Sequence, residues 1–217
     1  MTPVFPAAAS ASVAPPESPS RRSLAPLAAA TAERVVLVDE RDRPIGTAEK
    51  LAAHRDGGLL HRAFSIFLFD REGRMLLQQR AAAKYHFPSL WTNACCSHPR
   101  PGETVEAAAH RRLFEELGVE AVLVPLFSFV YRAEDRVSGL VEREFDHVFA
   151  GRIESEPRLC PDEVSAVAYE AFEVVERRCL ARPDDFTPWF QLALRELRAR
   201  GFVERWATPV APAAPRD

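Results

Sequence analysis

Two long β-forming segments joined by a short polar linker constrain the fold more than any other feature of this sequence. They are EAVLVPLFSFVYRA (120–133) and LVEREFDHVFAGRI (140–153), and both are rich in valine, phenylalanine and other β-formers. Because only residues 134–139 join them, they are expected to pair as neighbouring antiparallel strands. The chain therefore needs a sheet with long antiparallel strands.

Shorter segments add a hairpin and one further strand. AFSIFLFD (63–70) and RMLLQQR (74–80) flank Arg71-Glu72-Gly73, which is typical of a hairpin with a short glycine-containing loop. ERVVLVDE (33–40) is a short apolar run that predicts a strand, and the RDRPIG that follows it predicts a turn.

Two helices are expected beside these strands. TVEAAAHRRLFEEL (104–117) opens with Thr104 as a candidate N-cap and stops at Gly118. TPWFQLALRELRAR (187–200) has Thr187 as its candidate N-cap. The pattern predicts a mixed α/β domain of the α+β kind, with long antiparallel strands.

Both ends of the chain differ in composition from its centre. Residues 1–33 hold six of the 18 prolines and none of the nine glycines, and show no apolar periodicity. We expect a disordered extension, with an organellar transit peptide as the alternative. Residues 206–217 have a similar composition and are expected to form a disordered tail. A single domain of common size, 34–205, lies between them.

Composition also limits the partners. The formal net charge is −3, and no apolar run approaches the roughly 20 residues of a membrane-spanning helix. Neither nucleic acid nor a membrane is expected as a partner. Of the four cysteines, Cys95 and Cys96 are adjacent, which does not suit a disulfide framework. A reducing, cytoplasmic location is expected.

The expected helix 104–117 carries a charged pair on its apolar stripe. At 100° per residue, Arg112 and Glu116 fall among the residues that should face the core. Buried charges are costly unless they are paired or bound to something. Two interpretations stay open: an internal ion pair, or a pocket wall on which Glu116 holds a cation and Arg112 an anion.

Two carboxylates share one face of the second long strand. Alternation places Glu142 and Glu144 side by side, with Arg143 and Phe145 on the other face. Most such pairs are a solvated surface. The alternative is a metal site, or one metal ligand beside one general acid or base.

Histidines and one cysteine offer further candidates. His54 and His61 stand seven residues apart around the pair Gly57-Gly58, so they could meet only through a loop. His98 follows two residues after Cys96, and on a strand the two would share a face. A structural histidine, a zinc half-site and a reactive thiol all remain possible at these positions.

The segment from Ser97 to Val119, SHPRPGETVEAAAHRRLFEELGV, resembles the Nudix box G-x5-E-x7-R-E-U-x-E-E-x-G-U. Two positions depart from this pattern. Ser97 stands where the first glycine is expected, and Arg112 replaces the glutamate that follows the arginine. Losing that carboxylate removes one magnesium ligand of Nudix hydrolases, so ordinary Nudix hydrolysis is not expected.

Type I isopentenyl-diphosphate isomerases have a similarly altered box, and the likeness to them extends through most of residues 34–205. The similar segments, in the family's order, are EKLAAHRDGGLLHRAFS, QRAAAK, FPSLWTNACCSHP, FVYRA, GLVEREFDHVF, DEV and FTPW. Several independent motifs in one order are far more specific than the box alone. The resemblance implies an isomerase with a Nudix-type fold, a single domain in which a mixed β-sheet is flanked by helices.

The resemblance also implies a role for each matched residue. The metal ligands would be His54, His61, His98, Glu142 and Glu144. The catalytic residues would be Cys96, Glu144, Tyr131 and Trp189. The diphosphate would be held by Lys50, Arg80, Lys84 and Arg112, with Glu116 binding a magnesium ion shared with it.

The implied reaction interconverts isopentenyl and dimethylallyl diphosphate, in isoprenoid biosynthesis, by proton transfer through a carbocation. Cys96 and Glu144 would act from opposite sides of the isoprenoid, Tyr131 would relay protons to Glu144, and the indole of Trp189 would face the cation. The cofactors would be Mg²⁺ and one Mn²⁺, Zn²⁺ or Mg²⁺ ion at the His/Glu site. A small-molecule isoprenoid diphosphate is the expected partner of a monomer or weak homodimer. A nucleotide-type diphosphohydrolase and a non-catalytic ligand-binding module are the rival hypotheses.

Overall fold

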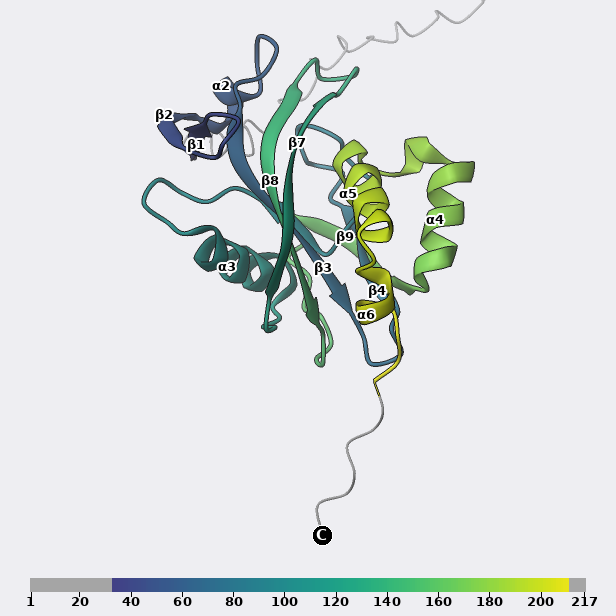
Figure 1. Ribbon diagram of the computed structural model, residues 1–217. Coiled ribbons are helices and arrows are strands. Elements are labelled where there is room, and N and C mark those ends of the chain that lie inside the picture. The colour runs from purple at the N-terminus through teal and green to yellow at the C-terminus, as the bar shows by residue number, and fades with distance from the viewer. Residues whose placement is uncertain (1–32, 211–217) are drawn as a thin grey trace, which may run out of the picture.

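The computed structural model describes residues 33–210, which form one mixed sheet covered by helices on both faces (Figure 1). Its strands are β1 (Arg34–Val38), β2 (Pro44–Glu49), β3 (His61–Phe69), β4 (Met75–Arg80), β5 (Trp91–Thr92), β6 (Cys95–Ser97), β7 (Val124–Glu134), β8 (Val141–Arg152) and β9 (Val164–Glu170). The helices are α2 (Lys50–Ala53), α3 (Val105–Leu117), α4 (Phe172–Ala181), α5 (Pro188–Ala199) and α6 (Val203–Trp206), with a 3₁₀ turn at Pro183–Asp185. The α+β architecture expected from the sequence is confirmed.

The sheet is built around β3. This strand runs parallel to β8 and antiparallel to β4 and β6, and β8 pairs with β7 on its other side. The two long segments therefore pair as expected, with Tyr131 opposite Glu144. The hairpin between β3 and β4 also forms, and its turn is closed by the backbone N–H of Arg74, which donates to the Asp70 carboxylate at 2.7 Å.

Both long helices begin and end near the expected residues. In α3 the hydroxyl of Thr104 accepts a hydrogen bond from the N–H of Ala107, and Gly118 ends the helix in the left-handed conformation at φ 62°. Thr187 stands at the N-cap of α5, but its side chain makes no capping bond. It donates instead to Thr92 at 2.9 Å, which ties α5 to the sheet.

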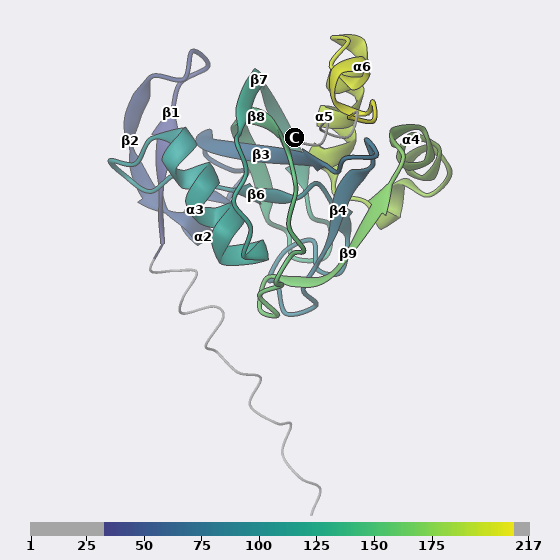
Figure 2. The same ribbon diagram turned by 90° about the horizontal axis from the view of Figure 1, so that it is seen from below.

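Alternate residues of β3 face two different cores. Ile66 and Leu68 pack with α3 on one face, whereas Phe67 and Phe69 pack with the helices α4 to α6 on the other. Figure 2 shows α3 and these C-terminal helices on opposite sides of the sheet. A strand buried on both faces reads as a continuous apolar run, which explains AFSIFLF. Ser65 is the polar exception, and it lies close to the candidate site.

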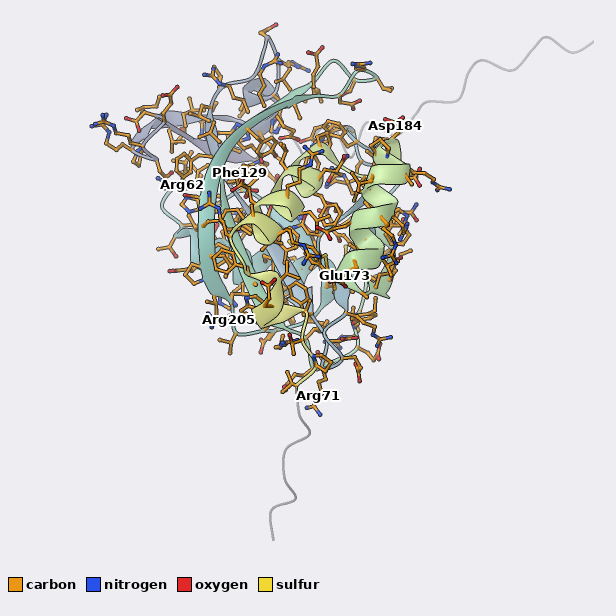
Figure 3. All side chains as sticks on the ribbon, turned by 45° about the vertical axis from the view of Figure 1, so that its right-hand side comes forward. Arg62, Arg71, Phe129, Glu173, Asp184 and Arg205 are labelled. Carbon is orange, nitrogen blue, oxygen red and sulfur yellow. The ribbon has the colours of Figure 1, made fainter. Side chains whose placement is uncertain are left out.

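The expected boundary at residue 205 falls too early. Trp206 is buried and stacks on Phe69 with ring centroids 6.2 Å apart, and the N–H of Val210 donates to the carbonyl of Arg71 at 2.8 Å. Arg71 lies at the β3–β4 turn, close to where the chain leaves α6 (Figure 3). Apolar packing therefore continues to Trp206, and a backbone hydrogen bond to the β3–β4 turn reaches Val210. The disorder expected for residues 1–32 and 211–217 lies outside the described residues. Within 33–210, no helix is long and apolar enough to cross a membrane.

Candidate active site

Three neighbouring strands and one tight loop bring the candidate ligands together. His61 opens β3 and is in register with Glu144 on β8, while His98 directly follows β6. His54 stands at the C-cap of α2, and the loop with Gly57 and Gly58 that follows it leads the chain to His61. Gly58 has φ 78°, and a Cβ there would lie 3.0 Å from the carbonyl oxygen of Val141. Glycine therefore lets this loop pack directly against the start of β8.

The five residues expected to bind a metal form one cluster. One ligand atom from each of them lies within 4.8 Å of all the others, and four of the side chains are buried: the group is His54, His61, His98, Glu142 and Glu144. His54 Nδ1 donates to the carbonyl of Lys50 at 2.6 Å, and His61 Nδ1 donates to that of Leu59 at 2.8 Å. These outer bonds turn each Nε2 toward the cluster, as is usual for metal-binding imidazoles.

The donor set of this cluster fits a divalent cation. When His61 is neutral, with its proton on Nδ1, its Nε2 presents a lone pair to His98 Nε2 at 3.1 Å and to Glu144 Oε1 at 3.4 Å. Lone pairs that face one another repel unless a proton or a cation lies between them. Imidazole nitrogens with carboxylate oxygens are ligands that several divalent metals accept.

The two carboxylates of the cluster have opposite electrostatic environments. Burial opposes ionisation of Glu142, but His54 and His86 overcome it and hold the pKa of this carboxyl well below its usual range. Burial, together with the charge of Glu142, raises the pKa of Glu144. Burial also disfavours the charged form of His54, yet the adjacent Glu142 raises its pKa to about 9. The pair Glu142–His54 is thus ionic, and Glu144 is the carboxyl that more readily holds a proton.

Cys96 lies beside the cluster, on β6, and polar side chains surround its sulfur. The thiol donates to the side-chain oxygen of Asn93 at 2.9 Å, and the indole N–H of Trp189 donates to the sulfur at 3.0 Å. Ser65 is 3.5 Å from the sulfur and also donates to the carboxylate of Asp146 at 2.7 Å. Burial, reinforced by Asp146, raises the pKa of Cys96 to about 12. The group is a protonated thiol at neutral pH.

Tyr131 reaches the cluster from β7. Its hydroxyl donates a short hydrogen bond to Glu144 Oε2, as the cross-strand register allows. Burial, followed by the charge of Glu144, raises the pKa of Tyr131 well above its usual value. Tyr131 therefore keeps its proton and is a stable hydrogen-bond donor to Glu144.

Four cations surround the inner cavity. This cavity, about 30 Å³ in volume, is lined by Cys96, Tyr131, Glu144 and Trp189 together with Lys50, Arg80, Lys84 and Arg112. Arg112 contacts Glu116 at 2.6 Å and Glu163 at 2.9 Å. The structure thus shows the internal ion pair between Arg112 and Glu116, and Arg112 also lines the cavity. That Glu116 holds a cation and Arg112 an anion stays a prediction.

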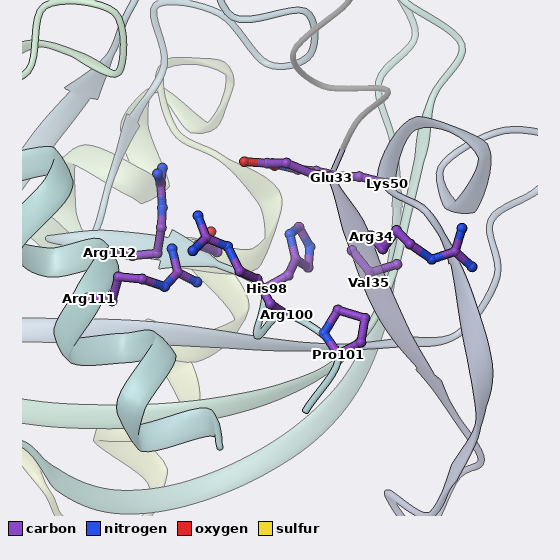
Figure 4. A pocket seen from close by; sticks show the side chains of 10 residues that line it. Glu33, Arg34, Val35, Lys50, His98, Arg100, Pro101, Arg111 and Arg112 are labelled. Carbon is purple, nitrogen blue, oxygen red and sulfur yellow. The ribbon is translucent and has the colours of Figure 1, made fainter. Parts of the chain in front are cut away.

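Carboxylates also hold the two lysines, whereas Arg80 donates to the backbone carbonyls of Phe87 and His86. Lys84 contacts Glu163 at 2.5 Å, and Lys50 contacts Glu33 at 2.8 Å. Burial, followed by Arg80, lowers the pKa of Lys84. A wider pocket of about 380 Å³ opens next to the inner cavity, where Arg100, Arg111 and Arg112 come together (Figure 4). The entrance is thus strongly cationic, as an anionic ligand requires.

Sequence reasoning missed His86, Asn93 and Glu163 as members of the site. His86 is 6% exposed and its Nε2 lies 2.5 Å from Glu142 Oε1. Burial lowers its pKa to about 4, although Glu142 lies beside it. A lone histidine in a loop carries no periodic signal. Asn93 and Glu163 sit inside WTNACCSHP and DEV, and only their place in those segments could have drawn attention to them.

Comparison with known proteins identifies the family of this chain. The model of the NUDIX domain family matches residues 59–190. An isopentenyl-diphosphate Delta-isomerase from Nocardia farcinica is 52% identical over 155 residues, which are 71% of this chain and 89% of that protein. Its counterpart from Streptomyces coelicolor is 50% identical over 77% of this chain and 86% of its own length. The counterpart from Pectobacterium atrosepticum is 46% identical over 75% of this chain and 90% of its own length.

Two solved structures share the fold. A protein from Deinococcus radiodurans superposes with a TM-score of 0.62 at 24% identity, over 76% of this chain and 98% of its own. A MutT protein from Methanosarcina mazei superposes with a TM-score of 0.54 at 14% identity, over 65% of this chain and 95% of its own. At these identities the likeness concerns the fold alone, and it confirms the Nudix-type architecture.

Proposed function

The chain belongs to the isopentenyl-diphosphate Delta-isomerase family of Nudix-domain proteins, and we propose that it interconverts isopentenyl diphosphate and dimethylallyl diphosphate. One observation carries the proposal. Cys96 and Glu144, two groups that can exchange protons, line the same cavity as the indole of Trp189, and cations surround that cavity. A double bond can move within the substrate only if one group adds a proton and another removes one.

Cys96 and Glu144 together account for both proton transfers. One of them adds a proton to the terminal alkene carbon of isopentenyl diphosphate, which leaves a tertiary carbocation. The other removes a proton from the carbon next to the cation on the diphosphate side, and the new double bond is that of dimethylallyl diphosphate. Tyr131 acts through Glu144, because its hydroxyl can supply or retain a proton at that carboxylate.

The carbocation must be kept from water. Trp189 is 3% exposed, and its indole lines the cavity beside Cys96. A cation over an indole face is stabilised by about 2 kcal/mol or more in a desolvated site. A cavity of about 30 Å³ leaves room for very few waters beside the indole.

The diphosphate would be bound where the cations meet the wider pocket. Glu33 holds Lys50 there, and Glu163 holds Lys84 and Arg112. When a diphosphate binds, these cations would exchange the carboxylates for diphosphate oxygens. Arg80 would complete the group. Glu116, which is 3% exposed, would hold the Mg²⁺ ion that accompanies the diphosphate.

The residues that would hold the second metal are His54, His61, His98, Glu142 and Glu144. A divalent Mn²⁺, Zn²⁺ or Mg²⁺ ion bound there would neutralise the two carboxylates and fix the orientation of Glu144. We also propose a cytoplasmic location and a monomeric or weakly dimeric state. The four cysteines are unpaired, which suits a reducing compartment.

The proposal is tested by incubating the protein with isopentenyl diphosphate, Mg²⁺ and Mn²⁺ in deuterated water and following the substrate by proton NMR. Dimethylallyl diphosphate should appear with deuterium in its new methyl group, and the Cys96→Ala variant should give none. If the folded, metal-loaded protein gives neither isomer nor label, isomerisation is excluded. Phosphate or pyrophosphate release from nucleotide diphosphates would then favour the hydrolase hypothesis.

A further inference from the structure

The two oxygens of the Glu142 carboxylate have different partners. Oε2 is 2.9 Å from His54 Nε2 and so faces the cluster of candidate metal ligands. Oε1 is 2.5 Å from Nε2 of His86. The group of ligand atoms that lie within 4.8 Å of one another does not include His86. His86 therefore contacts a candidate ligand from outside the cluster.

Hydrogen-bond chemistry fixes the direction of this contact. An ionised carboxylate only accepts, so the imidazole nitrogen that faces it must carry the proton. His86 Nδ1 is buried and has no partner among residues 33–210, which leaves Nε2 as the only polar contact of the ring. The bond from His86 to Glu142 is thus a single directional link between two buried groups.

The backbone around His86 is held from two sides. Arg80 donates to the carbonyl of His86 at 3.1 Å and to that of Phe87 at 3.0 Å. The N–H of Phe87 donates to the Asp135 carboxylate at 3.2 Å, and Phe87 has φ 45°, which few non-glycine residues adopt. Such a conformation persists only when its surroundings enforce it. The loop therefore presents the His86 ring to Glu142 in one orientation.

We propose that His86 is a positioning residue that sets the metal affinity of the cluster by holding Glu142 Oε1, so that Oε2 stays directed at the metal. Without the bond from His86, the carboxylate could rotate and share both oxygens with His54. Outer hydrogen bonds of this kind typically contribute about tenfold to hundredfold to metal affinity. The inference rests on the proposed metal site, and it adds to that site a residue that is not itself a ligand.

Three variants test the role of His86. His86→Phe keeps a ring for packing against Tyr85 and removes the donor. His86→Gln restores an N–H near the position of Nε2. His147→Phe is the matched control, because His147 also lies on a carboxylate, 3.0 Å from Asp42, but outside the cluster. Each metal-free protein is titrated calorimetrically with Zn²⁺ and with Mn²⁺, and its melting temperature without metal is recorded as a measure of folding.

The dissociation constant should rise about tenfold to hundredfold in His86→Phe, and stay near the wild-type value in His86→Gln and His147→Phe. An unchanged constant in His86→Phe would overturn the inference. Equal losses in His86→Phe and His86→Gln would also overturn it, because the imidazole itself would then be needed as a ligand. Glu142→Gln tests the metal site independently of His86. If this variant binds as tightly as wild type, the metal site itself is misplaced, whatever His86 does.

Discussion

The indole N–H of Trp189 donates to the sulfur of Cys96 at 3.0 Å. The two residues are 93 positions apart, on α5 and β6, and both line the inner cavity. This contact gives Trp189 two functions in the proposed reaction. Its ring face can stabilise a carbocation, and its N–H can stabilise negative charge on the sulfur when the thiol releases its proton.

Replacing Trp189 by phenylalanine should separate these functions. Trp189→Phe keeps an aromatic face but removes the N–H, and a lost hydrogen bond to a charged group costs about 1.5–3 kcal/mol. The kcat should therefore fall about tenfold to hundredfold, with little change in KM. Trp206→Phe is the control, because Trp206 is also a buried tryptophan but its N–H has no partner among the described residues. An equal loss of kcat in both variants would mean that the effect is one of packing.

Cys96→Ser and Cys96→Ala should nearly abolish turnover while the protein stays folded. Serine keeps the hydrogen bond to Asn93 but is a weaker acid, and alanine removes the proton donor. Steady-state rates are measured together with thermal unfolding. Near-normal turnover in either variant would remove Cys96 from the mechanism.

Glu116→Gln should chiefly weaken binding of the magnesium diphosphate. Glu116 is buried and already contacts Arg112, so the amide would remove one negative charge from the expected magnesium position. We expect KM to rise about tenfold or more, with a smaller change in kcat. Glu115→Gln is the control, since Glu115 is the preceding residue of α3 and is 37% exposed. An unchanged KM for isopentenyl diphosphate across Mg²⁺ concentrations would contradict the role of Glu116.

Because of Glu163, the free energy of unfolding should depend on pH below the ordinary pKa of a glutamate carboxyl. Burial opposes its ionisation, but Lys84 and Arg112 lower its pKa from 4.5 to about 2. A carboxyl whose pKa is lower in the folded state stabilises the fold above pH 4.5 and loses that contribution as the pH falls toward 2. A shift of this size corresponds to about 3 kcal/mol.

Urea unfolding at pH 7, 5 and 3 measures this contribution. Glu163→Gln should be less stable than wild type at pH 7, and the difference should shrink at pH 3. The control is Glu134→Gln, because the carboxylate of Glu134 is 54% exposed and only 3.7 Å from Arg132. A difference that stays constant across this pH range would show that the Glu163 carboxylate contributes through packing.

Local chemistry was enough to predict several parts of the fold. Thr104 and Gly118 mark the ends of α3, because capping and left-handed backbone depend on neighbouring residues only. The β7–β8 pairing is predictable since a short linker leaves two long strands few other partners. The sequence did not reveal that β3 is parallel to β8, nor that α4 exists. The parallel pairing depends on contacts between residues that are far apart in the chain, and α4 has no capping side chain at its start.

The sequence by itself determined the family of this chain and, through the family's motifs, a list of candidate residues. Only the tertiary structure decided how they meet. It directs one oxygen of Glu142 to His54 and the other to His86, and it places Glu163 between Lys84 and Arg112. A motif records which side chain stands at a position, whereas hydrogen bonds and ion pairs depend on separations of a few ångströms between residues far apart in sequence. Those separations are set by packing across the sheet.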